Sequence, residues 1–105
     1  MFAFRQDWIK FEKNLNNLGN QIVVPVPFTF RGVNTTDQEL EVEVKPSCGC
    51  TVVEYNDTVP VGGTFEINGT FTKTAKANHT KTITVRITKG EDKQDIQLVL
   101  KVTLI

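Results

Sequence analysis

Residues 82–88 read Thr-Ile-Thr-Val-Arg-Ile-Thr, a strict alternation of polar or charged side chains with β-branched apolar ones. Successive side chains of a β-strand point to opposite faces, so this period of two places Ile83, Val85 and Ile87 together on one face. Residues 96–104 repeat the pattern with a second apolar set: Ile96, Leu98, Leu100, Val102 and Leu104. The two stretches predict amphipathic strands, each with one face turned toward a core.

The same alternation extends through most of the chain. Further strands are predicted at residues 8–13, 22–30, 40–44, 51–55 and 65–71, with glycine, proline and asparagine turns between them. In the second of these, Ile22, Val24, Val26, Phe28 and Phe30 share one face. Pro25 and Pro27 remove hydrogen-bond donors from that strand, which predicts a sheet edge or a bulge. Residues 14–18 are expected to form one helical turn at most.

About seven short strands of this kind are typical of an immunoglobulin-like sandwich. The predicted fold class is therefore all-β, with two antiparallel sheets packed face to face. The chain has 105 residues, enough for a single domain with one modest core, and residues 1–105 are taken as that domain.

The composition argues against several classes of function. The 12 basic and 12 acidic residues cancel, so the chain lacks the clustered positive charge that duplex DNA requires. One histidine and two cysteines leave little material for catalysis, and there is no glycine-rich phosphate loop or catalytic triad pattern. We expect neither an enzyme nor a cofactor.

The N-terminal residues do not have the pattern of a secretory leader, and no apolar stretch is long enough to span a membrane. We therefore expect no membrane insertion, and a chain that is made and used, or assembled, in the cytosol. A periplasmic or envelope location is the alternative if a leader has been removed.

The first eight residues are unusually aromatic for a chain end. Phe2, Phe4 and Trp8 precede the first clear strand. Large aromatic side chains are favoured anchors at protein interfaces, so residues 1–8 are a candidate interaction arm. The alternative is that this arm pairs with the sandwich as a first strand.

Two charged groups are candidate docking surfaces. Lys73, Lys76 and Lys81 lie in a polar stretch between two predicted strands, and His79 in the same stretch is expected to be solvated. Glu39, Glu41 and Glu43 alternate with apolar residues and form an acidic face. Each group fits a partner of opposite charge or an ordinary solvated face.

The most distinctive motif is Ser47-Cys48-Gly49-Cys50-Thr51, which follows a predicted strand. Residues i and i+2 of a strand share a face, so the sulfurs of Cys48 and Cys50 could approach each other, but a disulfide would close a small, strained ring. A metal site would need further ligands, and a reactive thiol would need a neighbouring base. A structural role is favoured, with redox and metal roles left open.

In context, this motif resembles a bacterial immunoglobulin-like family of uncharacterised proteins related to the ASH/Hydin-like domains of cilia and centrosomes. The resemblance covers about residues 22–104 and is carried by five features: Phe28-Thr29-Phe30, the strand from Leu40 to Val44, Cys48-Gly49-Cys50-Thr51, the turn from Pro60 to Gly63, and the strands from Phe65 and Lys81. The resemblance implies an immunoglobulin-like fold, and most such relatives carry a secretory or lipoprotein leader.

These observations favour a non-enzymatic structural or interaction module with other protein subunits as partners. The leading hypothesis is an auxiliary protein of a bacteriophage capsid, located in the virion and docked through the aromatic arm. The alternative is a bacterial binding module at the cell envelope or in the cytosol that recognises protein or glycan through its loops.

Overall fold

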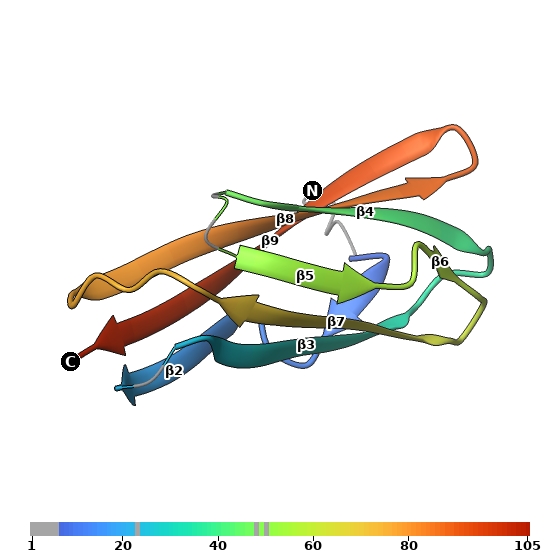
Figure 1. Cartoon of the computed structure of the whole chain (residues 1–105). Coiled ribbons are helices and arrows are strands. Elements are labelled where there is room, and N and C mark those ends of the chain that lie inside the picture. The colour runs from blue at the N-terminus through green and yellow to red at the C-terminus, as the bar shows by residue number, and fades with distance from the viewer. Residues whose placement is uncertain (1–6, 23, 48, 50) are drawn as a thin grey trace, which may run out of the picture.

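The computed structural model describes residues 7–22, 24–47, 49 and 51–105, and every helix or strand in that part of the chain is a β-strand (Figure 1). The strands are β1 (Ile9–Phe11), β2 (Leu15–Gln21), β3 (Val26–Asn34), β4 (Leu40–Pro46), β5 (Thr51–Tyr55), β6 (Thr58–Val59), β7 (Thr64–Phe71), β8 (Asn78–Lys89) and β9 (Asp92–Leu104). The described residues include no helix that is long and apolar enough to cross a membrane.

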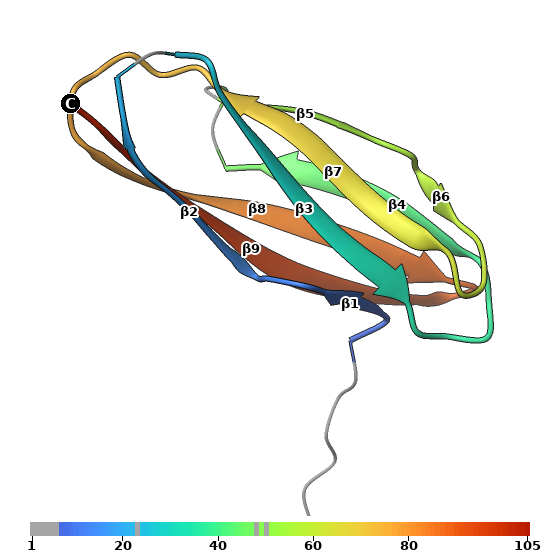
Figure 2. The ribbon, with the colours of Figure 1, turned by 90° about the horizontal axis from the view of Figure 1, so that it is seen from below.

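The strands form two sheets that face each other. One sheet has the order β1-β3-β7-β5 and the other the order β2-β9-β8-β4-β6 (Figure 2). The predicted all-β, immunoglobulin-like sandwich is confirmed, but with nine strands instead of seven. The prediction of purely antiparallel sheets is also wrong, because β2 runs parallel to β9.

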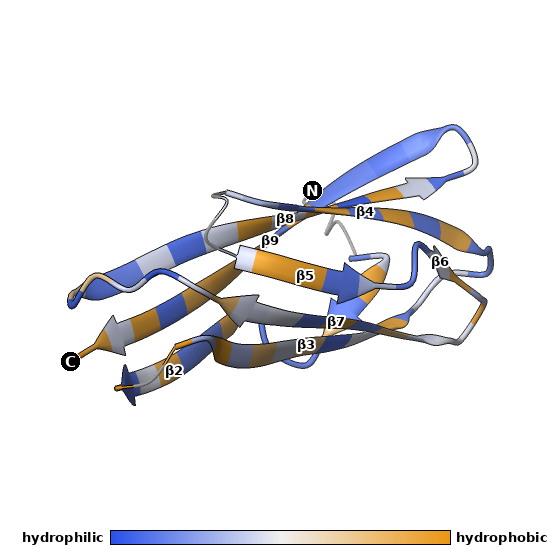
Figure 3. Cartoon of the chain, viewed as in Figure 1, coloured by the Kyte–Doolittle hydropathy of each residue, from blue (hydrophilic) through white to orange (hydrophobic). Residues whose placement is uncertain are grey.

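The core lies between the sheets and is built by the alternation seen in the sequence. Ile83, Val85 and Ile87 of β8 are fully buried, and the five predicted apolar residues of β9 are buried as well. Figure 3 shows the alternating hydrophobic and hydrophilic bands along β4, β8 and β9. The long β8–β9 pair turns through Gly90, whose φ of +61° is readily adopted only without a side chain.

The strand β2 corrects the prediction of a helical turn at residues 14–18. Its sequence, Leu-Asn-Asn-Leu-Gly-Asn-Gln, has little apolar alternation, and it becomes a strand by pairing with β9. The pairing register shifts between Asn17 and Asn20, and Gly19 takes the bulge with a φ of +66°. Asn17 Oδ1 accepts the Gly19 N–H at 3.0 Å and holds this bulge.

The strand β3 begins later than the sequence predicts. Val26, Phe28 and Phe30 are buried as expected, but Ile22 is 80% exposed because it lies between β2 and β3, in the segment that connects the two sheets. This corrects the placement of Ile22 on the core face.

Candidate functional site

The two lateral sides of the sandwich, where the outermost strands of the sheets lie, differ in whether the outward backbone groups have hydrogen-bond partners. On one side lie β1 and β2, the outermost strands of the two sheets. On the other side lie β5, the last strand of the four-stranded sheet, and β6, which covers part of β4 in the five-stranded sheet. We call these the crossing side (β1, β2) and the β5 side (β4, β5, β6).

On the crossing side the chain covers its own backbone. The segment from β1 to β2 passes from one sheet to the other (Figure 2), and the Glu12 N–H donates to the Arg31 carbonyl at 2.8 Å. The Asn16 side-chain amide donates to the Thr29 carbonyl at 3.0 Å. In the part of β3 that β1 does not pair, the two outward carbonyls of Thr29 and Arg31 therefore already accept hydrogen bonds.

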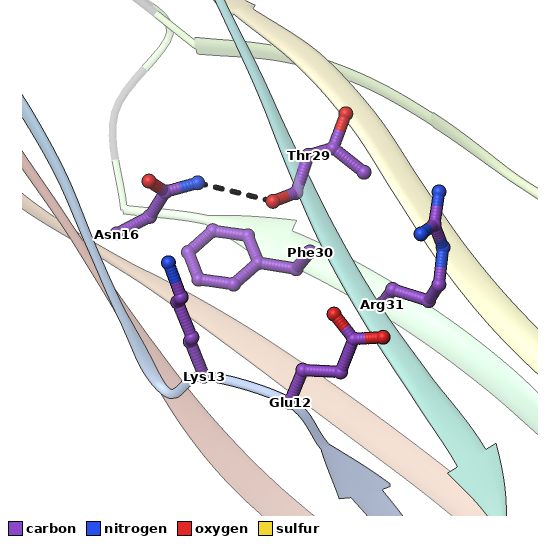
Figure 4. Close-up of a pocket in the computed structure, with 6 residues that line it drawn as sticks. All are labelled: Glu12, Lys13, Asn16, Thr29, Phe30 and Arg31. Atoms are coloured by element: carbon purple, nitrogen blue, oxygen red, sulfur yellow. Dashed lines mark hydrogen bonds between the residues drawn. The ribbon is translucent and has the colours of Figure 1, made fainter.

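A polar cleft of about 240 Å³ remains between the crossing segment and β3 (Figure 4). Its lining residues are Glu12, Lys13, Asn16, Thr29, Phe30 and Arg31, and the buried Phe30 ring contributes to the wall. The backbone groups of Thr29 and Arg31 point to this side, and because backbone direction alternates along a strand, those of Pro27 do too. The lack of an N–H at Pro27 therefore costs no hydrogen bond to β7. The prediction of an edge strand holds only locally: Pro27 lies in the part of β3 that β1 does not pair, Pro25 precedes the strand, and β3 is an inner strand of its sheet.

The backbone of β5 has one paired and one open side. The Val52 carbonyl oxygen points toward β7. It lies so near Gly69 of that strand that a Cβ added to Gly69 would be 2.8 Å from it. Backbone groups alternate between the two sides of an antiparallel strand, so Val52 and Glu54 bond to β7. Val53 and Tyr55 then direct their N–H and C=O groups outward, where this sheet ends.

The other strand at this side is better protected against further pairing. β6 and the residue before it cover the start of β4, where the Val42 N–H donates to the Asp57 carbonyl at 2.8 Å. Val42, Val44 and Pro46 share the outward direction, and Pro46 has no donor. Proline is a common protection of sheet edges; β5, a strand of five residues with one charged side chain, Glu54, contains no proline or lysine.

Beside this edge, the outer face of the sheet has a shallow hollow of about 200 Å³. It is lined by Val52, Glu54, Asn68, Gly69 and Thr70. The Val52 side chain is 56% exposed, and Gly69 contributes only backbone to the hollow, because its missing side chain is on the core face against the Phe28 ring. The β5 edge thus offers backbone groups and an apolar contact next to each other.

The charges near β5 fall into a paired and an unpaired group. Arg31 donates through Nε and Nη2 to Glu66 Oε2 at 2.9 and 2.8 Å, and Asn68 donates to Glu66 Oε1 at 2.8 Å. The Asn68 hydrogen bond, followed by Arg31, lowers the pKa of Glu66, and Glu66 raises the pKa of Arg31. In the described part of the chain no ion pair involves Glu54.

The aromatic arm can be placed only at its end, because Phe2 and Phe4 lie outside the described residues. Trp8 is half-buried and packs against the core. Its backbone N–H donates to Gln94 Oε1 at 2.8 Å, its backbone carbonyl accepts from the Thr35 N–H at 2.9 Å, and Lys89 Nζ lies 4.7 Å from its ring centroid. Trp8 is therefore attached to the sandwich.

The three lysines predicted to form a basic docking surface do not all lie in one loop. Lys73 and Lys76 are exposed between β7 and β8, whereas Lys81 is half-buried within β8. His79 corrects the prediction of a solvated loop residue: it is buried in β8 opposite Val102, with Nε2 2.7 Å from the Ala75 carbonyl oxygen. Its polar neighbours in sequence hide this position on the core face.

The acidic group lies where the sequence places it. Glu41 and Glu43 are exposed on the outer face of β4, and Glu39 is exposed just before that strand. Glu43 pairs with Lys45 at 3.2 Å. These carboxylates belong to the β5 side of the sandwich.

Of the Cys-Gly-Cys-Thr motif, Cys48 and Cys50 lie outside the described residues. Gly49 is exposed, and Thr51 is buried at the start of β5. The motif therefore leads directly into the open strand. Among the described residues, no three His, Cys, Asp or Glu side chains gather as a metal site would require.

Sequence reasoning predicted the strand at Thr51–Tyr55 but missed that it ends a sheet. The only local signal is the pair Val52-Val53, apolar residues on both faces of a strand that contains no lysine or proline. That signal alone does not distinguish an edge from a buried strand.

A family model described as "Protein of unknown function (DUF1573)" matches residues 8–104 of the chain. None of the curated proteins matches the sequence significantly.

Solved structures of other proteins share the fold at low sequence identity. The ASH/PapD-like domain 7 of human CEP192 has a TM-score of 0.79 and 7% identity, over 100% of this chain and 92% of that one. The VesB protease of Vibrio cholerae has a TM-score of 0.77 and 9% identity over 92% of this chain, which spans only 32% of the protease chain. The YadV chaperone has a TM-score of 0.65 and 10% identity, over 93% of this chain and 51% of that one. These likenesses show an immunoglobulin-like, PapD-like fold.

Proposed function

The chain belongs to the DUF1573 family, and from that premise we propose that it is a non-enzymatic binding module that takes up an extended segment of another protein at the free edge of β5. The segment adds a strand to the four-stranded sheet. Its backbone bonds to Val53 and Tyr55, and its side chains pack beside Val52. Strand addition is a general mode of peptide recognition in which main-chain hydrogen bonds supply affinity.

The observation that carries this proposal is the contrast between the two sides of the sandwich. On the crossing side, Glu12 and Asn16 use carbonyls of β3. On the β5 side, no strand among the described residues neighbours the outward groups of Val53 and Tyr55 in their sheet. An exposed edge of this kind is a template for pairing with another chain.

For the setting of this binding we propose the capsid of a bacteriophage, where the module would be an auxiliary protein of the virion. The second candidate is a module of the bacterial cell envelope or cytosol. The two differ in the genes expected beside the coding sequence: capsid and portal genes support the first, and envelope genes support the second.

The binding edge is tested with a library of random linear nine-residue peptides selected against the protein. The variant Val53→Pro removes the outward N–H without removing a bond to β7, so it should fold and lose binding of the selected peptides at least tenfold. Thr29→Pro is the matched control, because it removes an outward donor on the crossing side and should bind normally.

The proposal also has a readout that needs no variant. In the wild-type protein, a bound peptide should slow hydrogen exchange of the Val53 and Tyr55 amides. A library that yields no binder, or peptides that bind Val53→Pro as well as the wild type without protecting these amides, would contradict the proposal.

A further inference from the structure

We infer that the segment bound at β5 is basic: an extended stretch in which a lysine or arginine lies two residues from an apolar side chain. This inference rests on the proposed function and names the chemistry of its partner. It follows from the charges on the β5 side and from the order of side chains across the sheet.

The β5 side carries a strong excess of negative charge within a protein of zero net charge. Residues 39–59 contain five acidic residues and a single basic one, Lys45. The acidic residues are Glu39, Glu41, Glu43, Glu54 and Asp57. All five side chains are exposed in the structure. This region therefore favours a cationic partner, by an attraction that salt screens.

The acidic residues come from both sheets and lie close to the same margin. Cα atoms of β4 and β5 approach within 8 Å of each other, and the Asp57 carbonyl is bonded to the Val42 N–H of β4. Beside this contact, Glu41, Glu43 and Asp57 line a hollow of about 400 Å³ that also contains the cations Arg86 and Lys93. Glu54 lies on the outer face of the four-stranded sheet that an added strand would extend, and Glu41 and Glu43 lie on the outer face of the five-stranded sheet at the same margin.

Within the group, Glu54 is the carboxylate placed to pair with an added strand. It lies on the outer face of β5 with no ion pair among the described residues, whereas Glu66 on the neighbouring strand is already bonded to Arg31. Glu54 stands in register with Asn68 of β7. A lysine or arginine opposite Glu54 on a new strand would complete this row with opposite charges, which stabilise cross-strand pairs.

The next row of side chains on the outer face, which contains Val52 and Thr70, favours an apolar residue on the added strand. Val52 stands in register with Thr70, and Thr70 with Pro27 of β3. An added strand would place one side chain beside Val52 at the hollow over Gly69. Because Val52 and Glu54 are two residues apart, their partners on the added strand are also two residues apart.

The test uses the same nine-residue peptide library and examines which residues are enriched. We expect lysine and arginine to be enriched over aspartate and glutamate, with a basic and an apolar residue at i and i+2. In synthetic copies of the selected peptides, replacing that lysine by glutamine should weaken binding about threefold, and raising the salt to about 0.5 M should weaken it further.

Protein variants assign the charge preference to its site. Glu54→Gln should remove the advantage of lysine over glutamine in the peptide, while Glu12→Gln on the crossing side is the matched control and should leave it intact. Because Glu54 is exposed on the strand, both variants are expected to fold.

Three outcomes would overturn the inference; the first leaves the proposed function standing, and the other two overturn both. Peptides that depend on Val53 but show no preference for basic residues would leave the binding edge standing and remove the basic partner. A lysine preference that survives Glu54→Gln and Val53→Pro would place the charge effect elsewhere. A wild-type dimer that Val53→Pro converts to monomer would make a second copy of the chain the occupant of β5.

Discussion

The crossing side and the β5 side of the sandwich are both margins formed by short strands, but they differ in whether the outward backbone groups are hydrogen-bonded. Both present strands of only a few residues at a sheet margin, yet on one side the chain itself supplies the missing hydrogen-bond partners. Glu12 and Asn16 reach the carbonyls of β3 because the chain continues from β1 into the opposite sheet. The comparison teaches that the path of the flanking chain, more than the composition of the strand, decides whether an edge is free.

The largest effect is expected from emptying the core beneath the crossing side. Phe30 is 2% exposed and lies beside the cleft where β2 separates from β3. Phe30→Ala should lower the free energy of unfolding by about 3–5 kcal/mol, because it removes a buried ring and leaves a cavity. Denaturant unfolding measures this, with the exposed Val33→Ala as the control. A loss below about 1 kcal/mol would mean that the crossing side does not depend on this packing.

A smaller effect is expected from the buried amide that anchors the β5 side. Asn34 donates to the carbonyls of Gln38 and Pro60 at 2.9 and 3.1 Å and accepts the Thr36 N–H at 2.8 Å. Asn34→Ala should cost about 2–3 kcal/mol, because buried backbone groups lose their partners. It should also speed hydrogen exchange of the Val42 amide next to β6.

The control for this prediction is Asn78→Ala, whose side chain accepts a hydrogen bond from Thr103 at an exposed position. That substitution should change the free energy of unfolding by less than about 0.5 kcal/mol. Equal effects at the two sites would show that Asn34 does not hold β6 in place.

The bulge in β2 should contribute less again. Gly19 has a φ of +66°, and an added Cβ would meet no atom within 4 Å. Gly19→Ala should therefore lower the free energy of unfolding only through the strain of a positive φ in a residue with a Cβ, by about 1 kcal/mol. Gly49→Ala, at a position where an added Cβ also meets no atom within 4 Å, is the comparison and should cost less. If Gly19→Ala is neutral, the bulge does not constrain the crossing side, and thermal unfolding of both variants decides this.

The smallest effect is expected from the ion pair next to the β5 edge. The pKa of Glu66 is lowered by the Asn68 hydrogen bond and by Arg31, so the ionised form is favoured in the folded protein. Its contribution is present above the unfolded-state pKa and is lost as the pH falls through the folded pKa. An NMR titration should show the Glu66 pKa rising in Asn68→Ala; an unchanged value would remove Asn68 as the main cause.

Much of the fold could be predicted because local alternation and burial agree. The stretches 82–88 and 96–104 place their apolar residues in the core as their period requires. β2 could not be predicted in this way, because its strand conformation comes from pairing with β9 some eighty residues later. His79 was missed for a related reason: its register opposite Val102, and not its polar neighbours, sets its burial.

The candidate site was only partly visible in the sequence. The acidic residues of β4 were predicted to be a docking surface or an ordinary solvated face; they are exposed on the β5 side, and their docking role stays a prediction. The free edge itself depends on which strand comes last in a sheet, and this is fixed by contacts between β5 and β7 that the local sequence does not encode.

Hydrogen exchange of the four consecutive amides of β5 tests the account most directly. The amides of Val52 and Glu54 point to β7 and should be protected, whereas those of Val53 and Tyr55 point to the open side and should exchange much faster. An alternating slow–fast–slow–fast pattern from Val52 to Tyr55 in the unbound protein is the predicted result. Equal protection at all four positions would mean that β5 is already covered, and would contradict the free edge on which the proposed binding depends.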